Sequence, residues 1–234
     1  MKPESTDEVF QKFLQLEGVI YRQAYEGSNR RFLYRRGSRE NKVVLIAHAD
    51  TIYQGYPDLH TSYDDISRSY NPWAGADDRA GCAIVWLLRN LGHSLLIVDG
   101  EEAGLEGAFW LMEKNKDIAD EINNHQFLLE FDRAGWRNFK TYFVGSTEFI
   151  NYINESTGYH LASPFSFTDI ITLCRNVCGA NISVGYLNEH TEHEYVDTSF
   201  WLETLRIVKR WLSAPYIPKF PLGKPDGELV IHYI

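Results

Sequence analysis

Cysteine is scarce in this sequence, with three residues in 234. Cys82, Cys174 and Cys178 cannot all pair with one another, and an odd number of cysteines in an intracellular chain indicates reduced thiols. Cys174 and Cys178 are four residues apart and could share a helix face as a metal pair. No second Cys/His pair at zinc-finger spacing accompanies them, so we favour structural cysteines.

Long hydrophobic runs and an excess of basic residues are also missing. No apolar run approaches the roughly 20 residues that a membrane-spanning helix needs. The first residues, Met-Lys-Pro-Glu-Ser-Thr-Asp-Glu, contain neither the apolar segment nor the cleavage site of a secretory signal. The formal net charge of -9 argues against nucleic acid as a partner, because phosphate binding needs clustered positive charge. We therefore expect a cytoplasmic protein that binds neither membranes nor nucleic acid.

Hydrophobic residues make up 44% of the chain, which is enough for a full core. Short continuous apolar runs, typical of strands buried on both faces, alternate with segments of helical periodicity. The expected strands are 19–25, 31–36, 43–47, 95–98, 127–131, 142–144 and 182–186, and the expected helices are 6–16, 79–90, 107–113, 147–156 and 197–212. This alternation predicts one α/β domain over residues 1–234, with three layers (α/β/α) around a central mixed, largely parallel sheet. Tyr53–Trp73 is expected to be a long loop.

Polar residues that could catalyse a reaction or bind a metal follow the carboxyl ends of the expected strands. This is the edge where open α/β sheets bind ligands. They are His48 and Asp50; Glu101 and Glu102; Glu130 and Asp132; His190; and, where the long loop enters a helix, Asp77 and Asp78. Each has an ordinary interpretation on its own, such as a structural histidine or a carboxylate at a helix N-terminus. Together they would place two imidazoles and several like charges at one edge, which requires a neutralising cation. This mixed set of donors suits zinc, manganese or iron, with zinc favoured for hydrolysis.

Five segments in order carry a resemblance to a known family: AHADT, GADDRAG, GEEAGLEGA, EFDRAG and NEHTEHEYVD, from Ala47 to Asp197. The sequence resembles the superfamily of cocatalytic dinuclear zinc exopeptidases, which includes peptidase T-like tripeptidases, bacterial leucyl aminopeptidases and carboxypeptidase G-like enzymes. Asp132 and His190 are too close in sequence for the lid domain that many relatives insert between these positions. The resemblance therefore implies the compact form of the fold, and leaves the oligomeric state open.

The resemblance also implies roles for individual residues. The expected metal ligands are His48, Asp77, Glu102, Asp132 and His190, with Asp77 bridging two zinc ions and manganese or cobalt as substitutes. Glu101 corresponds to the general base and Asp50 to the carboxylate that orients His48. His193 is a competing candidate for the position of His190. The peptide bond between Asp77 and Asp78 is often cis in relatives.

The implied reaction is hydrolysis of an amide bond by a hydroxide that the two zinc ions share. A small peptide is the favoured substrate, which makes the protein an aminopeptidase or a di/tripeptidase. Two alternatives stay open: an amidohydrolase acting on N-acyl amino acids, and an inactive metal-binding relative. The expected cavity walls are Tyr53–Trp73, Arg133–Asn138 and Phe165–Asp169, with Tyr186 and Phe165 as candidates for the cavity or the core. Arg133 would either bind a substrate carboxylate or neutralise its acidic neighbours.

Overall fold

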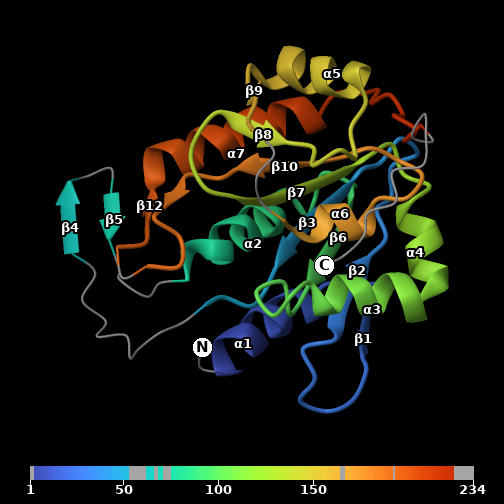
Figure 1. Ribbon diagram of the computed structural model, residues 1–234, viewed down its shortest axis with the longest axis horizontal. Helices are drawn as coiled ribbons and strands as arrows, with labels where there is room; N and C mark the ends of the chain where they lie inside the picture. Colours follow the sequence, from blue (N-terminus) through green and yellow to red (C-terminus); the bar gives the residue numbers. More distant parts are fainter. Residues whose placement is uncertain are drawn as a thin grey trace.

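An eight-stranded mixed sheet runs through the middle of the fold (Figure 1). The computed structural model describes residues 3–52, 62–65, 68–70, 75–163, 167–191 and 193–223, and only the backbone of 3–5, 62–65 and 68–70. The strands in spatial order are β1 (Val19–Gln23), β2 (Arg31–Arg35), β6 (Ser94–Val98), β3 (Val44–His48), β7 (Leu128–Arg133), β10 (Gly179–Ser183), β8 (Asn138–Lys140) and β9 (His160–Leu161). The four central strands β6, β3, β7 and β10 are parallel, and their carboxyl ends meet at one edge.

Helices cover both faces of this sheet, so the predicted three-layer α/β/α architecture is confirmed. Alternate residues of β3 point to opposite faces: Leu45 and Ala47 join one hydrophobic cluster, whereas Val44 and Ile46 join the other. The first cluster is covered by α1 (Pro3–Leu14), α2 (Ala76–Leu88), α5 (Thr147–Thr157) and α7 (Thr198–Leu212), and the second by α3 (Glu106–Lys114), α4 (Lys116–Ile122) and α6 (Asp169–Leu173). No helix among the described residues is long and apolar enough to span a bilayer.

A second, four-stranded sheet lies beside the first and was not predicted. Its order is β11 (Tyr186–Leu187), β12 (Tyr195–Asp197), β5 (Arg68–Tyr70) and β4 (Ser62–Asp65), and β4 and β5 protrude at the left of Figure 1. Two of its strands lie within Tyr53–Trp73, so the expectation of a continuous loop there was wrong. The remainder of that segment is outside the described residues. The short polar sequences of β4 and β5 lack the apolar alternation by which strands are identified.

Two expected strands differ in position. The strand expected at 182–186 is β10, which begins earlier, at Gly179. Glycine is depleted in strands, so this start was not predicted. Any side chain at position 179 would collide with Cys174 and Ile170, so the packing there requires glycine. The segment expected at Tyr142–Val144 is a turn in which Tyr142 and Phe143 have φ of 47° and 68°. The strand of this region is β8 instead, and the short helices α4 and α6 also went unpredicted.

Candidate metal centre

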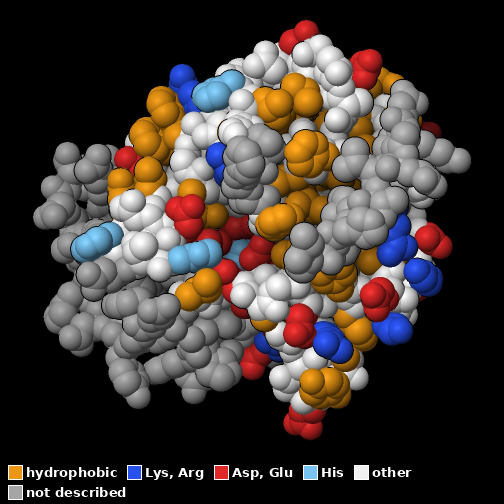
Figure 2. All heavy atoms as spheres, in the orientation of Figure 1, with side chains coloured by type: hydrophobic (Ala, Val, Ile, Leu, Met, Phe, Trp, Pro, Cys, Tyr) orange, Lys and Arg blue, Asp and Glu red, His pale blue; other side chains and the backbone are white. Residues whose placement is uncertain are grey.

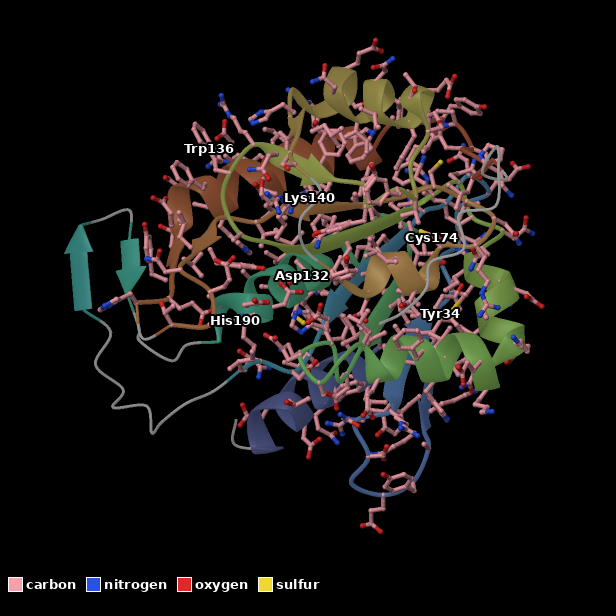
Figure 3. All side chains as sticks on the ribbon, in the orientation of Figure 1. Tyr34, Asp132, Trp136, Lys140, Cys174 and His190 are labelled. Atoms are coloured by element: carbon pink, nitrogen blue, oxygen red, sulfur yellow. The ribbon has the colours of Figure 1, made fainter. Side chains whose placement is uncertain are left out.

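The predicted metal ligands lie close together at the carboxyl-end edge of the main sheet, on strand ends and on the segments that follow them. His48 is the last residue of β3, Asp132 lies near the end of β7, and Glu102 follows β6. Asp77 lies at the start of α2, and His190 lies in the turn between β11 and β12. Figure 3 labels Asp132 and His190, which lie near each other in the middle of the view although they come from distant parts of the sequence.

Asp77 lies between the two histidines. Its Oδ1 is 3.1 Å from Nε2 of His48, and its Oδ2 is 3.1 Å from Nε2 of His190. On one side, Oδ1 of Asp132 lies 3.2 Å from Nε2 of His48; on the other, Oε1 of Glu102 lies 2.9 Å from Nε2 of His190. The arrangement therefore has two halves, each with one imidazole and one carboxylate of its own, that share the carboxylate of Asp77.

Asp78 is also close to this centre but serves the backbone. Donor atoms of His48, Asp77 and Glu102 lie within 4.8 Å of one another, and so do those of His48, Asp78 and Asp132. The oxygens of Asp78, however, already accept hydrogen bonds from the amides of His48 (3.2 Å) and Gly81 (2.9 Å). Because both oxygens are used and the side chain is fully buried, we regard Asp78 as the link between α2 and β3. The peptide bond between Asp77 and Asp78 is cis.

Asp50 connects His48 to the loop that follows β6. Its Oδ1 lies 3.4 Å from Nδ1 of His48, and its two oxygens accept the backbone amides of Glu101 (3.2 Å) and Glu102 (3.1 Å). The distance to Nδ1 is too long for a strong hydrogen bond, so the two amide contacts are the firmer ones. Asp50 therefore holds Glu101 and Glu102 in position beside the imidazole.

Three polar side chains surround Asp132, and of these the sequence indicated only Tyr186, as a candidate for the cavity or the core. Thr168 donates to Oδ2 at 2.8 Å, and the hydroxyl of Tyr186 donates to Oδ1 at 3.1 Å. Asn181 exchanges hydrogen bonds with the backbone of Asp132, at 2.9 and 2.6 Å. Tyr186 is only 2% exposed, yet its hydroxyl reaches the centre, so it belongs to both the core and the site. These contacts fix the direction of the Asp132 carboxylate.

Glu194 supports Asp77 from the opposite direction. It is 4% exposed, and its Oε1 accepts the backbone amide of Asp77 at 2.7 Å. The nearby His190 has a φ of 63°, a left-handed conformation that is uncommon for a residue other than glycine and is found often at functional sites. His193 lies exposed on the same turn, where its backbone amide donates to Thr191. The structure thus brings His190, of the two candidates, to Asp77 and Glu102.

The crowding of carboxylates shifts their protonation. Burial raises the pKa of Glu101 to about 9, with Asp132 and Glu102 adding to the increase and His48 opposing it. Burial likewise raises the pKa of Asp132 to about 6 and that of Glu194 to about 7. The contacts to Asp77 and Glu102 raise the pKa of His190 to about 10. The protein groups alone therefore leave a surplus of negative charge, which a divalent cation would neutralise.

Two further carboxyl groups lie in the interior next to this centre. Glu130 and Asp169 are fully buried, and their carboxyl oxygens have no hydrogen-bond partner among the described residues. Burial, together with repulsion from neighbouring carboxylates, raises the pKa of both well above the ordinary range. The raised pKa favours the neutral, protonated form of both groups.

A cavity of about 370 Å³ opens onto the centre. Figure 2 shows a hollow with acidic oxygens on its floor, a histidine at its edge and hydrophobic side chains beside it. The lining includes Glu101, Arg133, Tyr142, Phe167, Tyr186 and Glu189. Of the predicted cavity walls, Arg133 contributes from the end of β7, Ala134 from just after it, and Phe167 from the segment before α6; Phe165 is outside the described residues.

Comparisons with known proteins identify the family and agree with the fold. The sequence matches the profile of peptidase family M28 over residues 33–171. A search of curated protein sequences gave no match. Among solved structures, the aminopeptidase PepT of Bacillus cereus is similar over 88% of this chain and 91% of that chain, with 12% identity and a TM-score of 0.62. A tripeptidase of Staphylococcus aureus is similar over 88% of this chain and 91% of that chain, with 14% identity and a TM-score of 0.62. The LapA aminopeptidase of Legionella pneumophila matches 92% of this chain and 65% of that chain, at 13% identity and a TM-score of 0.59.

Proposed function

Because the chain belongs to peptidase family M28, we propose that it is an exopeptidase that removes the N-terminal residue of small peptides with the help of two zinc ions. Manganese or cobalt would be able to replace the zinc. The observation that carries the proposal is the position of Asp77 between His48 and His190, because one carboxylate with an imidazole on each side fits a bridged pair of cations.

The proposed ligands divide into two sets. His48 and Asp132 would hold one ion, His190 and Glu102 the other, and Asp77 both. Nitrogen and carboxylate oxygen are the donors that zinc accepts, and each half leaves room for a further ligand from the cavity side. When bound, the two ions would activate a water molecule and polarise the carbonyl group of the scissile amide bond.

Glu101 is the proposed general base. It lines the cavity next to Glu102 and is not one of the proposed metal ligands. As a carboxylate it would accept a proton from the attacking water and deliver it to the departing amine. With a pKa of about 9 from the protein groups alone, Glu101 would be protonated at pH 7. Nearby divalent charge lowers the pKa of a carboxylic acid, so metal binding would make the base available.

Asp50, Thr168, Asn181 and Glu194 are proposed to position the groups that react. None of them needs to touch the substrate: each fixes a ligand or the loop that carries Glu101 and Glu102. Partners of this kind set the direction and basicity of metal ligands, and losing one typically lowers metal affinity by about 10- to 100-fold. The number of such contacts supports a centre built for metal rather than a chance cluster of acids.

We also propose that residues 1–234 act as a single catalytic domain and that the protein works in the cytoplasm. The continuous main sheet supports the first proposal. The second is supported by the three cysteines, all of which are unpaired and buried.

The proposal is tested by assaying zinc-loaded protein on peptides with a free α-amine and on their N-acylated counterparts, with metal content measured in parallel. We expect two zinc ions per chain and cleavage of the free-amine peptides. Preference for the N-acylated compounds would instead indicate an amidohydrolase, and a zinc-loaded protein that cleaves neither class would refute an enzymatic role.

Two variants test the assigned residues. Glu101→Gln should keep both zinc ions and the fold, while kcat falls by about 10²- to 10⁴-fold, because a general base contributes about that much. Asp77→Ala should lose at least one zinc ion, since both halves share this carboxylate. Full activity in Glu101→Gln would rule out the proposed proton transfer.

A further inference from the structure

Arg133 lines the cavity. It ends β7, directly after Asp132, and is partly buried. Its Nε donates to the side chain of Asn138, which fixes one edge of the guanidinium group. Among the described residues, no carboxylate forms an ion pair with Arg133, and its two terminal nitrogens have no acceptor. By contrast, Arg137 on the same segment is paired with Glu203.

Arg133 is the only lysine or arginine among the described residues that line the cavity, whose other charged side chains are carboxylates and His190. The carboxylates that we propose as zinc ligands would be neutralised by the metal, so the guanidinium group would be left to favour an anion beside it. Lys140 lies outside this lining: it is only 6% exposed, and its Nζ is 5.6 Å from the ring centroid of Tyr142, which lines the cavity. Burial lowers the pKa of Lys140, and the positive charge of Arg133 lowers it further.

The size and walls of the cavity restrict what this anion belongs to. Its volume of about 370 Å³ is near the lower end of the roughly 300–1,000 Å³ typical of ligand pockets. Tyr142, Tyr186 and the 83% exposed Phe167 line the same cavity as the proposed zinc ligands and Arg133. Such a cavity accommodates a short chain with apolar side chains and one negatively charged end.

We propose that Arg133 binds the C-terminal carboxylate of the substrate, so that the enzyme acts on dipeptides and tripeptides with a free carboxyl end. This inference rests on the proposed peptidase function and adds the substrate class. A planar guanidinium group with two unused nitrogens matches a carboxylate, and such paired hydrogen bonds are among the strongest available to a protein.

The test compares the dipeptide Leu-Leu with Leu-Leu-amide, which differs only in the charge at the carboxyl end. For the wild-type enzyme we expect kcat/KM to be about 10- to 100-fold higher for the free acid. Arg133→Gln should abolish this preference by lowering the value for the acid alone, and Arg133→Lys should restore part of it. Arg137→Gln is the matched control, because it removes an arginine from the same segment outside the cavity, and it should keep the wild-type preference.

Binding supplies a readout that does not depend on turnover. Reduced-amide analogues of both dipeptides, titrated calorimetrically into the zinc-loaded protein, should show the same preference for the acid and the same loss in Arg133→Gln. Equal cleavage of acid and amide by the wild type would overturn the carboxylate subsite while leaving the peptidase proposal intact. Tighter binding of the acid analogue, lost in Arg133→Gln, in a protein that cleaves neither peptide would support the subsite and refute the peptidase. A fall of equal size for acid and amide in Arg133→Gln would mean that Arg133 only neutralises its acidic neighbours.

Discussion

Glu194 offers a direct test of how Asp77 is held. Its carboxylate accepts the backbone amide of Asp77 at 2.7 Å in a site that is 4% exposed. Replacing it with alanine would leave that amide buried without an acceptor. A buried amide left without an acceptor costs about 1–3 kcal/mol, which corresponds to about 5- to 150-fold in affinity. Because Asp77 faces both histidines, we expect weaker zinc binding in both halves of the centre.

The assay is a zinc titration against a chromophoric chelator, with circular dichroism to verify the fold. Glu194→Gln keeps an amide oxygen that can accept the same hydrogen bond, so it should bind zinc within about threefold of the wild type, well under the 1.4 kcal/mol that a tenfold change represents. Glu203→Ala is the control for removing a glutamate away from the centre, because the partly exposed Glu203 is paired with Arg137. Wild-type zinc affinity in a folded Glu194→Ala protein would refute the reasoning.

Three further outcomes follow from the structure. Gly81→Ala should destabilise the protein by roughly 3 kcal/mol or more in urea unfolding, because the new Cβ would lie 1.8 Å from a carbonyl oxygen of β7; an unchanged midpoint would contradict this packing. His93 and His125 are buried with pKa values lowered to about 4, so each should contribute a loss of stability of up to roughly 2 kcal/mol at pH 5 relative to neutral pH, because the unfolded form binds more protons in this window. Replacing either with Gln should remove that share of the pH dependence of urea unfolding, and an unchanged pH dependence in both variants would refute that assignment. Tyr186→Phe removes the hydroxyl donor to Asp132 and should lower zinc affinity by about 3- to 10-fold; a titration showing no change would exclude that role.

The central sheet could be predicted from the sequence because its strands are buried on both faces. Val44–His48 and Ser94–Val98 consist almost entirely of apolar residues, and this pattern is independent of what packs around them. The strands β4 and β5 are polar; β4 pairs with β5, and β5 also pairs with β12, which is far away in the sequence. Their pairing depends on tertiary structure that no local pattern indicates.

The candidate site also has a part that could be predicted from local sequence and a part that depends on tertiary structure. Its proposed ligands lie in short motifs at strand ends, so the sequence indicated His48 and Asp132 before their geometry was known. Their supports are scattered: Asn181 reaches Asp132 because β10 pairs with β7 in a particular register, and Thr168 reaches it from the start of α6. Glu194 is the exception, since it lies inside the motif that contains His190, where an acidic residue just before a strand was a usable signal.

The two histidines differ greatly in their access to water, which has a consequence for how the protein would respond to metal scarcity. The His48 side chain is 0% exposed, whereas that of His190 is 45% exposed. Under the proposed ligand set, a chelator would reach the outer ion first, and the inner one would leave only after the surrounding packing opened. Slow depletion would then pass through a half-loaded form that retains the buried ion, and refilling a single exposed position would be enough to bring the protein back into use.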